Sequence, residues 1–367
     1  MGLQSPLHQR HVSLGAKLAD FGGWDMPIEY PATSGGGVIA EHTAIRERVG
    51  IFDVSHLGKA EIIGEGALEF LNSAITNDLT RITDGQAQYT MLCDDASGGV
   101  IDDLIVYRKS ATNLFLIPNA ANTDAVVKAL QAAAPKNLTI NNLHQSYAVL
   151  AVQGPESEAV LNAIGINTEL EYMSFHETTL HGAPLIICRT GYTGERGFEL
   201  LPLWSEAEKI WDALIPEIDA RGGRVCGLGA RDTLRTEMGY PLHGHELSLA
   251  ITPIQANASW AVGMKKASFW GKAVCEREKS DGPVRILRAL KAHDRGIPRA
   301  GMKVLNKDNV EIGEVTSGTF SPTLRTGIAL ALISPQYVVG EKVLIDVRGR
   351  ISELEIVKVP LVPSRVK

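Results

Sequence analysis

Cysteine is scarce in this chain, and no two cysteines form a Cys-x-x-Cys pair. The 367 residues include four, Cys93, Cys188, Cys226 and Cys275. Isolated cysteines in a chain of this length are typical of buried thiols in a reducing compartment, and not of a disulfide framework. We therefore expect free thiols and a cytoplasmic location.

Long apolar runs and an excess of basic residues are also missing. No stretch approaches the length that spans a membrane, and residues 1–10 carry neither a secretory apolar core nor the arginines of a transit peptide. The formal net charge is −6, from 36 lysines and arginines against 42 aspartates and glutamates, which argues against a broad nucleic-acid-binding surface. We expect no membrane and no nucleic-acid partner, although one or two arginines could still hold a small anion.

The motifs of common cofactors are absent as well. Gly227-Leu-Gly-Ala-Arg-Asp232 lacks the third glycine of a dinucleotide fingerprint, and no phosphate-binding P-loop occurs. Glu41-His42 has no second histidine or cysteine at ligand spacing, so we do not expect a metal site there.

The length predicts two or three domains, and the composition, 44% hydrophobic and 21% charged, is ordinary for a globular protein. From residue 284 onward short strands alternate with glycine turns. The predicted strands are 286–291, 302–305, 312–317, 328–332, 343–347 and 354–359. Six strands at this spacing indicate a small antiparallel barrel.

Residues before 284 mix helices and strands. Apolar spacing predicts helices at 7–20, 38–49, 67–75, 119–133, 156–164, 205–220 and 269–281, and a further helix that follows Gly227. Ser205 is the expected N-cap of the helix 205–220. Strands are expected at 50–63, 86–93, 100–107, 113–118, 138–143, 146–153, 184–189 and 198–203, and residues 21–27 as a structured loop.

Two adjacent aspartates follow the turn Ser97-Gly-Gly99 and begin an apolar strand. Because side chains alternate along a strand, Asp103 and Tyr107 share one face and Asp102 lies on the other. Tyr89, on the preceding strand of the same hairpin, can reach the surface of Tyr107. A carboxylate beside phenols could hold a polar heterocycle. The alternative is that both aspartates satisfy backbone groups of the turn.

Two further polar positions have open interpretations. Glu199 follows the loop Thr190–Gly197, whose three glycines permit close approach of a ligand but equally suit a long hairpin loop. Arg231 and Arg235 are four residues apart and share a helix face. From this pattern alone, an ion pair with a neighbouring acid is favoured over ligand binding for Arg231.

Six stretches, taken in order, resemble the aminomethyltransferases of the glycine cleavage system, the T-protein family. They are Phe21-Gly-Gly-Trp-Asp-Met-Pro27, Gly50-Ile-Phe-Asp-Val-Ser-His56, Gly98-Gly-Val-Ile-Asp-Asp-Leu104, Arg189-Thr-Gly-Tyr-Thr-Gly-Glu195, Gly227-Leu-Gly-Ala-Arg-Asp232 and Thr316-Ser-Gly-Thr-Phe-Ser-Pro-Thr323. The resemblance runs from about residue 7 to 360. The glycine run 35–37 departs from the family pattern, outside the ligand motifs.

The resemblance implies an α+β fold, a three-domain cloverleaf with a central folate pocket and a C-terminal antiparallel β-barrel. The first domain would comprise residues 1–56 plus 148–240, the second 57–147 plus 241–283, and the barrel 284–367. The implied reaction transfers an aminomethyl group from the lipoyl arm of H-protein to tetrahydrofolate, which releases ammonia and forms 5,10-methylenetetrahydrofolate. Association with the other glycine cleavage proteins is implied, and no metal, flavin or nicotinamide is required.

The family pattern also assigns site residues. Asp103 would face the folate 10-nitrogen as the catalytic carboxylate, either stabilising developing positive charge or accepting a proton. Glu199 would accept hydrogen bonds from the pterin, and Arg231 would pair with a folate-tail carboxylate or organise the pocket wall. The implied folate-binding set is Tyr89, Tyr107, Asn119, Tyr192, Glu199 and Arg231.

Two rival functions remain. A demethylase of the same superfamily would share the pocket and differ in its donor, but the intact Ile101-Asp-Asp-Leu104 favours aminomethyl transfer, and no amino-terminal flavin domain is present. A folate-binding protein of iron–sulfur maturation would carry a Lys-Gly-Cys-Tyr-x-Gly-Gln-Glu type motif, which this sequence lacks.

Overall fold

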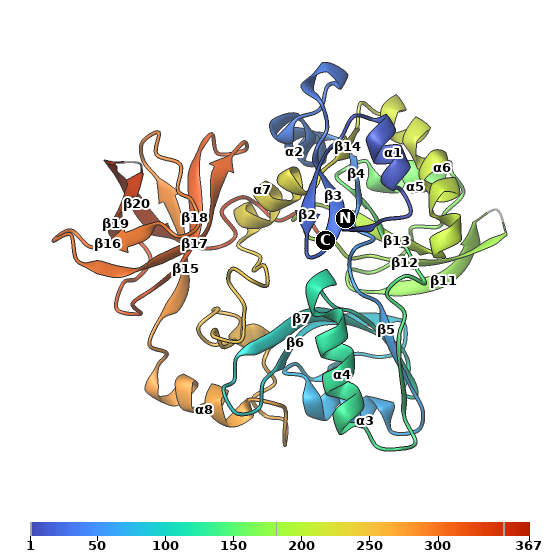
Figure 1. Cartoon of the computed structure of the whole chain (residues 1–367), viewed down its shortest axis with the longest axis horizontal. Helices are drawn as coiled ribbons and strands as arrows, with labels where there is room; N and C mark the ends of the chain where they lie inside the picture. Colours follow the sequence, from blue (N-terminus) through green and yellow to red (C-terminus); the bar gives the residue numbers. More distant parts are fainter. Residues whose placement is uncertain (1, 181, 348) are drawn as a thin grey trace.

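The computed structural model describes residues 2–180, 182–347 and 349–367, and it forms three lobes around a centre (Figure 1). Two lobes are built on open sheets flanked by helices, and the third is a β-barrel. Helix α7 (Leu228–Met238) lies between the barrel and the upper sheet lobe (Figure 1). This arrangement confirms the predicted three-lobed α+β fold.

The upper lobe contains a six-stranded sheet in the order β11-β12-β13-β10-β4-β14. Its strands are β4 (Gly50–Asp53), β10 (Leu150–Gln153), β11 (Phe175–Leu180), β12 (Ala183–Cys188), β13 (Gly197–Pro202) and β14 (Arg224–Cys226). Helices α2 (Val38–Glu47), α5 (Ser157–Ala163) and α6 (Ala207–Ala220) accompany it. The apolar faces of α5 and α6 and of the sheet form one core that includes Trp211 and Phe198.

The amino-terminal segment differs from the prediction. Helix α1 (His8–Ser13) ends well before residue 20, because Gly15 adopts a φ of 71° and the chain turns into β2 (Lys17–Phe21). Gly22 and Gly23, at φ of 61° and 86°, make the tight turn into β3 (Trp24–Glu29). The predicted loop 21–27 is therefore a hairpin, completed by β1 (Leu3–Gln4) alongside β3.

The lower lobe contains a five-stranded sheet in the order β6-β7-β8-β5-β9, with helices α3 (Ala67–Ala74) and α4 (Thr123–Ala133). The strands are β5 (Ala60–Ile63), β6 (Gln86–Cys93), β7 (Val100–Ser110), β8 (Asn113–Ile117) and β9 (Thr139–Asn142). The predicted β6–β7 hairpin is confirmed, and its register places Tyr89 opposite Ile105. The expected strand 50–63 is in fact two strands, β4 and β5, that belong to different sheets.

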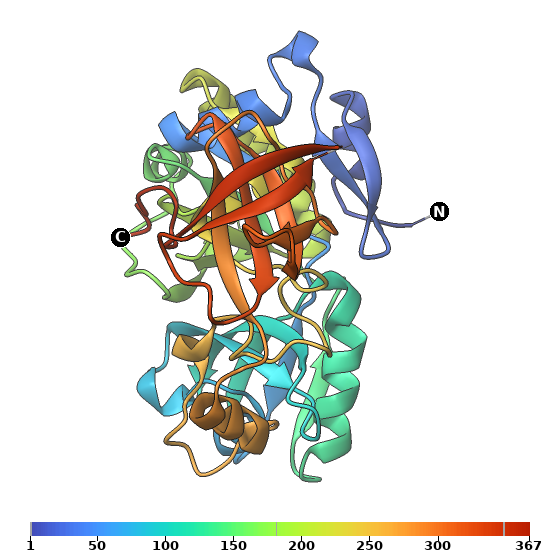
Figure 2. The same cartoon turned by 90° about the vertical axis from the view of Figure 1, so that its left-hand side faces the viewer.

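The carboxy-terminal barrel is closed, in the order β15-β18-β17-β16-β19-β20, and all its neighbouring strands are antiparallel (Figure 2). Its strands are β15 (Ile286–Ala292), β16 (Lys303–Leu305), β17 (Glu311–Ser321), β18 (Thr326–Ile333), β19 (Lys342–Val347) and β20 (Arg350–Val357). This confirms the predicted barrel. Helix α8 (Lys272–Asp281) precedes it, as expected. Ser205 is not an N-cap, because a 3₁₀ turn over Trp204–Glu206 places Glu206 before α6.

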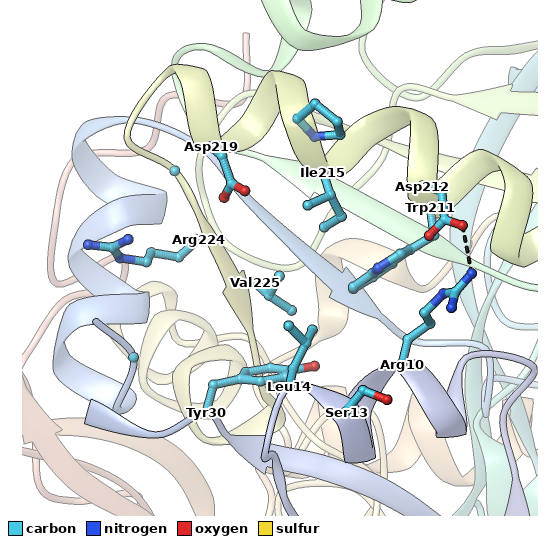
Figure 3. A pocket seen from close by; sticks show the side chains of 13 residues that line it. Arg10, Ser13, Leu14, Tyr30, Trp211, Asp212, Ile215, Asp219, Arg224 and Val225 are labelled. Carbon is cyan, nitrogen blue, oxygen red and sulfur yellow. Dashed lines mark hydrogen bonds and ion pairs between the residues drawn. The ribbon is translucent and has the colours of Figure 1, made fainter. Parts of the chain in front are cut away.

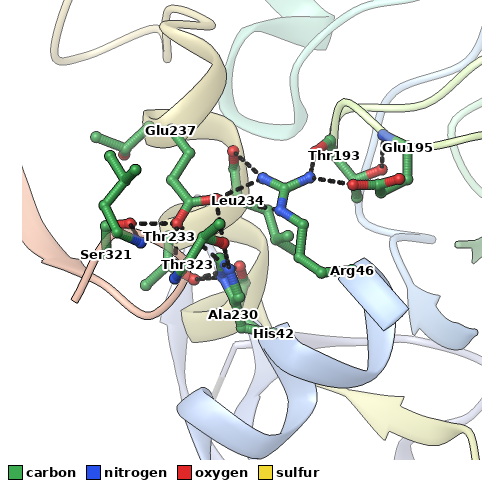
Figure 4. Close-up of polar contacts among 12 residues, drawn as sticks. His42, Arg46, Thr193, Glu195, Ala230, Thr233, Leu234, Glu237, Ser321 and Thr323 are labelled. Carbon is green, nitrogen blue, oxygen red and sulfur yellow. Dashed lines mark hydrogen bonds and ion pairs between the residues drawn. The ribbon is translucent and has the colours of Figure 1, made fainter. Parts of the chain in front are cut away.

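A buried polar network joins the barrel to helices α2 and α7 (Figure 4). Nη2 of Arg46 lies 2.7 Å from Oε2 of Glu237, and Nη1 of Arg46 lies 3.0 Å from Oε1 of Glu195. From the barrel, the hydroxyls of Ser321 and Thr323 donate to the Glu237 carboxylate. Since α7 also carries Arg231, the barrel and the centre of the molecule are linked through one helix.

Candidate active site

A cavity of about 120 Å³, called the central cavity below, lies between the two sheet lobes, and all seven residues proposed from the sequence line it. They come from both open sheets and from α7. The lining residues are Phe21, His56, Leu57, Tyr89, Asp103, Leu104, Ile105, Tyr107, Ile117, Asn119, Gly191, Tyr192, Glu199, Arg231, Pro241 and Leu242. Asp103 and Tyr107 both border this cavity, as expected for residues on one face of β7, whereas Asp102 does not border it.

Asp103 is held in place by two donors. The Tyr89 hydroxyl donates to its Oδ2 at 3.0 Å, and the Asn119 amide donates to its Oδ1 at 2.8 Å. Removal from water raises the pKa of the Asp103 carboxyl above its ordinary value, against the lowering effect of the hydrogen bond from Tyr89. The carboxylate is thus oriented, poorly hydrated and more basic than an exposed aspartate.

Asp102 points to the opposite side of the strand but reaches the same amide. Asn119 donates to Oδ1 of Asp102 at 2.9 Å from its side chain and to Oδ2 at 2.9 Å from its backbone, and Asn122 adds a bond of 2.7 Å. Asp102 is fully buried, and burial followed by the nearby charge of Asp103 raises the pKa of its carboxyl. Sequence alternation separated the two aspartates correctly but missed this bridge through Asn119.

A second polar group closes another wall of the cavity. Tyr107 and Thr190 are joined by a hydroxyl–hydroxyl contact of 3.2 Å, and the Thr190 hydroxyl donates to Oε2 of Glu199. Glu199 is 8% exposed and lies on β13, where it borders the cavity. The carboxylate is therefore anchored on one oxygen beside a phenol. Thr190 was not identified from the sequence, because its role depends on a partner 83 positions away.

Arg231 and Tyr192 form a third wall. The Arg231 guanidinium lies over the Tyr192 ring at 4.6 Å, and the Tyr192 hydroxyl donates to the Pro241 carbonyl. Among the residues that the structure describes, no carboxylate forms an ion pair with Arg231, and its Nη1 is buried without a hydrogen-bond partner. The alternative that Arg231 serves an ion pair is therefore wrong.

Two aromatic side chains support the cavity from outside. Trp260 stacks on Tyr89 at a centroid distance of 5.2 Å, and Tyr240 stacks on Tyr192 at 5.6 Å. Trp260 is 66% exposed, which is unusual for so large an apolar side chain. Neither residue was identified from the sequence, which offers no local signal for stacking between side chains far apart in the chain.

A larger cavity, of about 530 Å³, lies elsewhere, between α1, α6 and β14 (Figure 3). Its charges are partly compensated, since Arg10 pairs with Asp212 at 2.6 Å. None of the seven proposed residues borders it. The larger cavity is therefore not the better candidate. We place the candidate site at the central cavity, which is lined by Asp103, whose carboxyl pKa is raised, and by the buried Glu199.

Within residues 2–180, 182–347 and 349–367, no cluster of histidine, cysteine, aspartate and glutamate could hold a metal ion. In the same ranges, no helix has both the length and the apolar character to cross a membrane.

Comparison with known proteins identifies the family. Residues 7–266 match the model of the GCVT N-terminal domain, and residues 285–363 match the glycine cleavage T-protein C-terminal barrel domain. The chain belongs to the glycine cleavage T-protein family. It is therefore an enzyme of the aminomethyltransferase type.

Individual relatives agree with this family over the whole chain. An aminomethyltransferase of Parafrankia sp. is 56% identical over 98% of both chains, and one of Mycobacterium tuberculosis is 55% identical over 100% of this chain and 98% of its own. The crystal structure of the glycine cleavage system aminomethyltransferase T from Bartonella henselae superimposes with a TM-score of 0.92 at 34% identity, covering 100% of this chain and 99% of that one.

Proposed function

We propose that this T-protein family member transfers an aminomethyl group from the lipoyl arm of H-protein to tetrahydrofolate. The products are 5,10-methylenetetrahydrofolate, ammonia and dihydrolipoyl H-protein. The observation that carries the proposal is Asp103, a poorly hydrated carboxylate oriented by Tyr89 and Asn119 in one cavity with Glu199 and Arg231.

In this proposal the cavity walls recognise the folate. Glu199 keeps one carboxylate oxygen for the amino and ring N–H groups of the pterin, because Thr190 bonds the other. Tyr107, Tyr192 and Tyr89 supply aromatic surface for a planar ring system. Arg231, with a free Nη1, pairs with a carboxylate of the folate tail or orders the wall next to Tyr192. A ligand of that length requires the cavity to widen beyond its present 120 Å³.

Asp103 is the proposed catalytic residue. Carbon–nitrogen and carbon–sulfur bonds at one carbon both break during the transfer, so positive charge develops on that carbon. An oriented carboxylate in a cavity poor in water stabilises such charge strongly. Its raised pKa also suits it to accept the proton that the attacking folate amine releases.

The proposed partners are the lipoylated H-protein and, through it, the other glycine cleavage proteins. The donor arm approaches Asp103 from the side opposite the folate tail, so that donor carbon and folate nitrogen meet at roughly 3–3.5 Å. We propose the cytoplasm as the compartment, in keeping with four buried cysteines that form no disulfide.

The test mixes purified protein, tetrahydrofolate and glycine, with and without aminomethyl-loaded H-protein, and measures ammonia and methylenetetrahydrofolate. Stoichiometric formation of both products is expected only with the loaded H-protein. Formation of both without it would refute the proposal. Turnover of a methylated sulfur compound or amine instead would favour a demethylase.

A further inference from the structure

His56 has no role in the function proposed so far, yet it borders the central cavity. It follows β4 in the stretch Gly50–His56, is 2% exposed, and packs edge-on against Phe21 with ring centroids 5.2 Å apart and planes at 82°. Its Nδ1 is buried and has no hydrogen-bond partner among the residues that the structure describes.

An unpartnered ring nitrogen in a buried position is costly. Leaving a buried polar group without its hydrogen bond destabilises a protein, so such groups in native structures call for an explanation. The hydrogen bond between His56 and His144 does not satisfy this nitrogen. It joins Nε2 of His144 to the backbone carbonyl of His56 at 2.8 Å and does not involve Nδ1 of His56.

A second residue that lines the same cavity also carries an unpartnered atom. Nη1 of Arg231 is also buried without a hydrogen bond in the described part of the chain. His56 and Arg231 come from separate elements, the end of β4 and helix α7, and both face one space. Two unpartnered atoms on residues of one cavity are expected where a bound ligand supplies the missing hydrogen bonds.

The charges nearby determine which ligand group suits His56. Burial and then the positive charge of Arg231 lower the pKa of the imidazole to about 3, with smaller effects from Asp53, Lys59 and His144. The ring is therefore neutral at physiological pH and cannot act as a general base there. The cationic neighbours Arg231 and Lys59 disfavour binding of the amine of the aminomethyl donor near His56. The hydrogen-bond partner that suits Nδ1 of His56 is therefore an uncharged polar atom of the acceptor.

We infer that His56 is a further ligand-contacting residue, whose Nδ1 forms a hydrogen bond with an uncharged polar atom of the bound tetrahydrofolate. This inference rests on the proposed function. It assigns His56 to binding and not to proton transfer.

Two substitutions separate the ring nitrogens. In His56→Asn the side-chain amide lies as many bonds from Cα as Nδ1, whereas in His56→Gln it lies as many as Nε2. His56→Leu removes both. Tetrahydrofolate affinity is measured by calorimetry for each variant, with the melting temperature of the free protein as a check on folding. His144→Leu is the matched control, because His144 touches His56 but does not line the cavity.

His56→Asn is expected to bind tetrahydrofolate within about threefold of the native affinity. His56→Gln and His56→Leu are expected to weaken binding by roughly 5- to 100-fold, the equivalent of one unmade hydrogen bond. His144→Leu should lower the melting temperature and leave the affinity unchanged. If His56→Leu does not fold, the comparison of His56→Asn with His56→Gln decides.

Three results would overturn the inference: native affinity in His56→Leu or His56→Gln, equal weakening in His56→Asn and His56→Gln, or weakening in His144→Leu as large as in the His56 variants. Failure of the native protein itself to bind tetrahydrofolate is a different outcome, since it would refute the proposed function.

Discussion

The Tyr89 hydroxyl donates to Oδ2 of Asp103 at 3.0 Å, across the two strands of one hairpin, and this bond points the carboxylate into the central cavity. Tyr89 is itself held by the exposed ring of Trp260, which stacks on it. The orientation of the proposed catalytic carboxylate therefore depends on Tyr89, and the position of Tyr89 depends on Trp260, from the segment that leads towards the barrel.

Asp103→Asn should lose most of the activity while the fold and much of the folate affinity persist. Asparagine has nearly the same size but carries no charge to stabilise a cation and accepts no proton. Loss of one such electrostatic contact costs about 100- to 1000-fold in rate. Single-turnover formation of methylenetetrahydrofolate measures the loss, with the melting temperature as the check on folding.

Asp102→Asn is the comparison for that variant. Asp102 lies on the opposite face, so we expect a smaller loss of rate, caused by displacement of Asn119, which donates two hydrogen bonds to Asp102. Equal losses in the two variants, with normal folding, would contradict the assignment of the faces.

The contribution of the Asp102 and Asp103 carboxyls to the stability of the native protein should fall as pH rises above about 4, the ordinary pKa of an aspartate. The pKa values of Asp102 and Asp103 are both raised, so the folded state keeps protons that the unfolded chain has lost. This stabilising contribution is fully present below the pKa that the carboxyl has in the unfolded chain, and it disappears as pH passes the pKa that the carboxyl has in the folded protein. Asp102→Asn should show a smaller decrease in urea midpoint from pH 4 to 8, and an unchanged pH dependence would contradict the raised pKa of Asp102.

Tetrahydrofolate should raise the melting temperature. A ligand that binds only the native state adds about 2.7 kcal/mol at 100 times its dissociation constant. Glu199→Ala should reduce the shift, because pterin donors would remain unpaired in a buried site. Lys342→Ala, at an exposed ion pair of the barrel, is the control and should shift as the native protein does. No shift at saturating ligand would count against the whole site.

Glu237→Ala should destabilise the protein by about 3–5 kcal/mol, because it leaves the buried Arg46 with part of its charge uncompensated. Urea unfolding measures the loss. Arg46→Met combined with Glu237→Leu should recover part of it, since both charges of this ion pair are removed together and Glu195 keeps Arg365 at 3.6 Å. A single Glu237→Ala variant as stable as the native protein would show that the network in Figure 4 contributes nothing to docking of the barrel.

Local patterns predicted what depends on near neighbours in sequence. The strand alternation that puts Asp103 with Tyr107, and the hairpin that brings Tyr89 to them, follow from a period of two. The barrel followed from the spacing of its strands. The discontinuous division at 1–56 plus 148–240 and 57–147 plus 241–283 came from the resemblance and stays a prediction. The strands of the six-stranded sheet all lie within the ranges of the first domain, and those of the five-stranded sheet lie within 57–147.

The features that the sequence did not predict depend on contacts between residues far apart in the chain or on the geometry of a turn. The hairpin at residues 17–29 was mistaken for a helix and a loop, because two adjacent glycines can mark a flexible segment or a tight turn. The amide bridge of Asn119 between Asp102 and Asp103 requires the end of β8 to lie beside β7. The free nitrogen of His56 is visible only when every possible partner has been placed around it.

The position of β4 has a consequence for synthesis on the ribosome. β4 lies inside its sheet, where Ile51 pairs with Val152 on one side and with Val225 on the other. Neither partner has been made when β4 emerges, whereas the five strands of the lower sheet all lie between residues 60 and 142. The lower sheet can therefore form first during translation, while the nascent β4 stays unpaired and open to chaperones until α7 is about to follow.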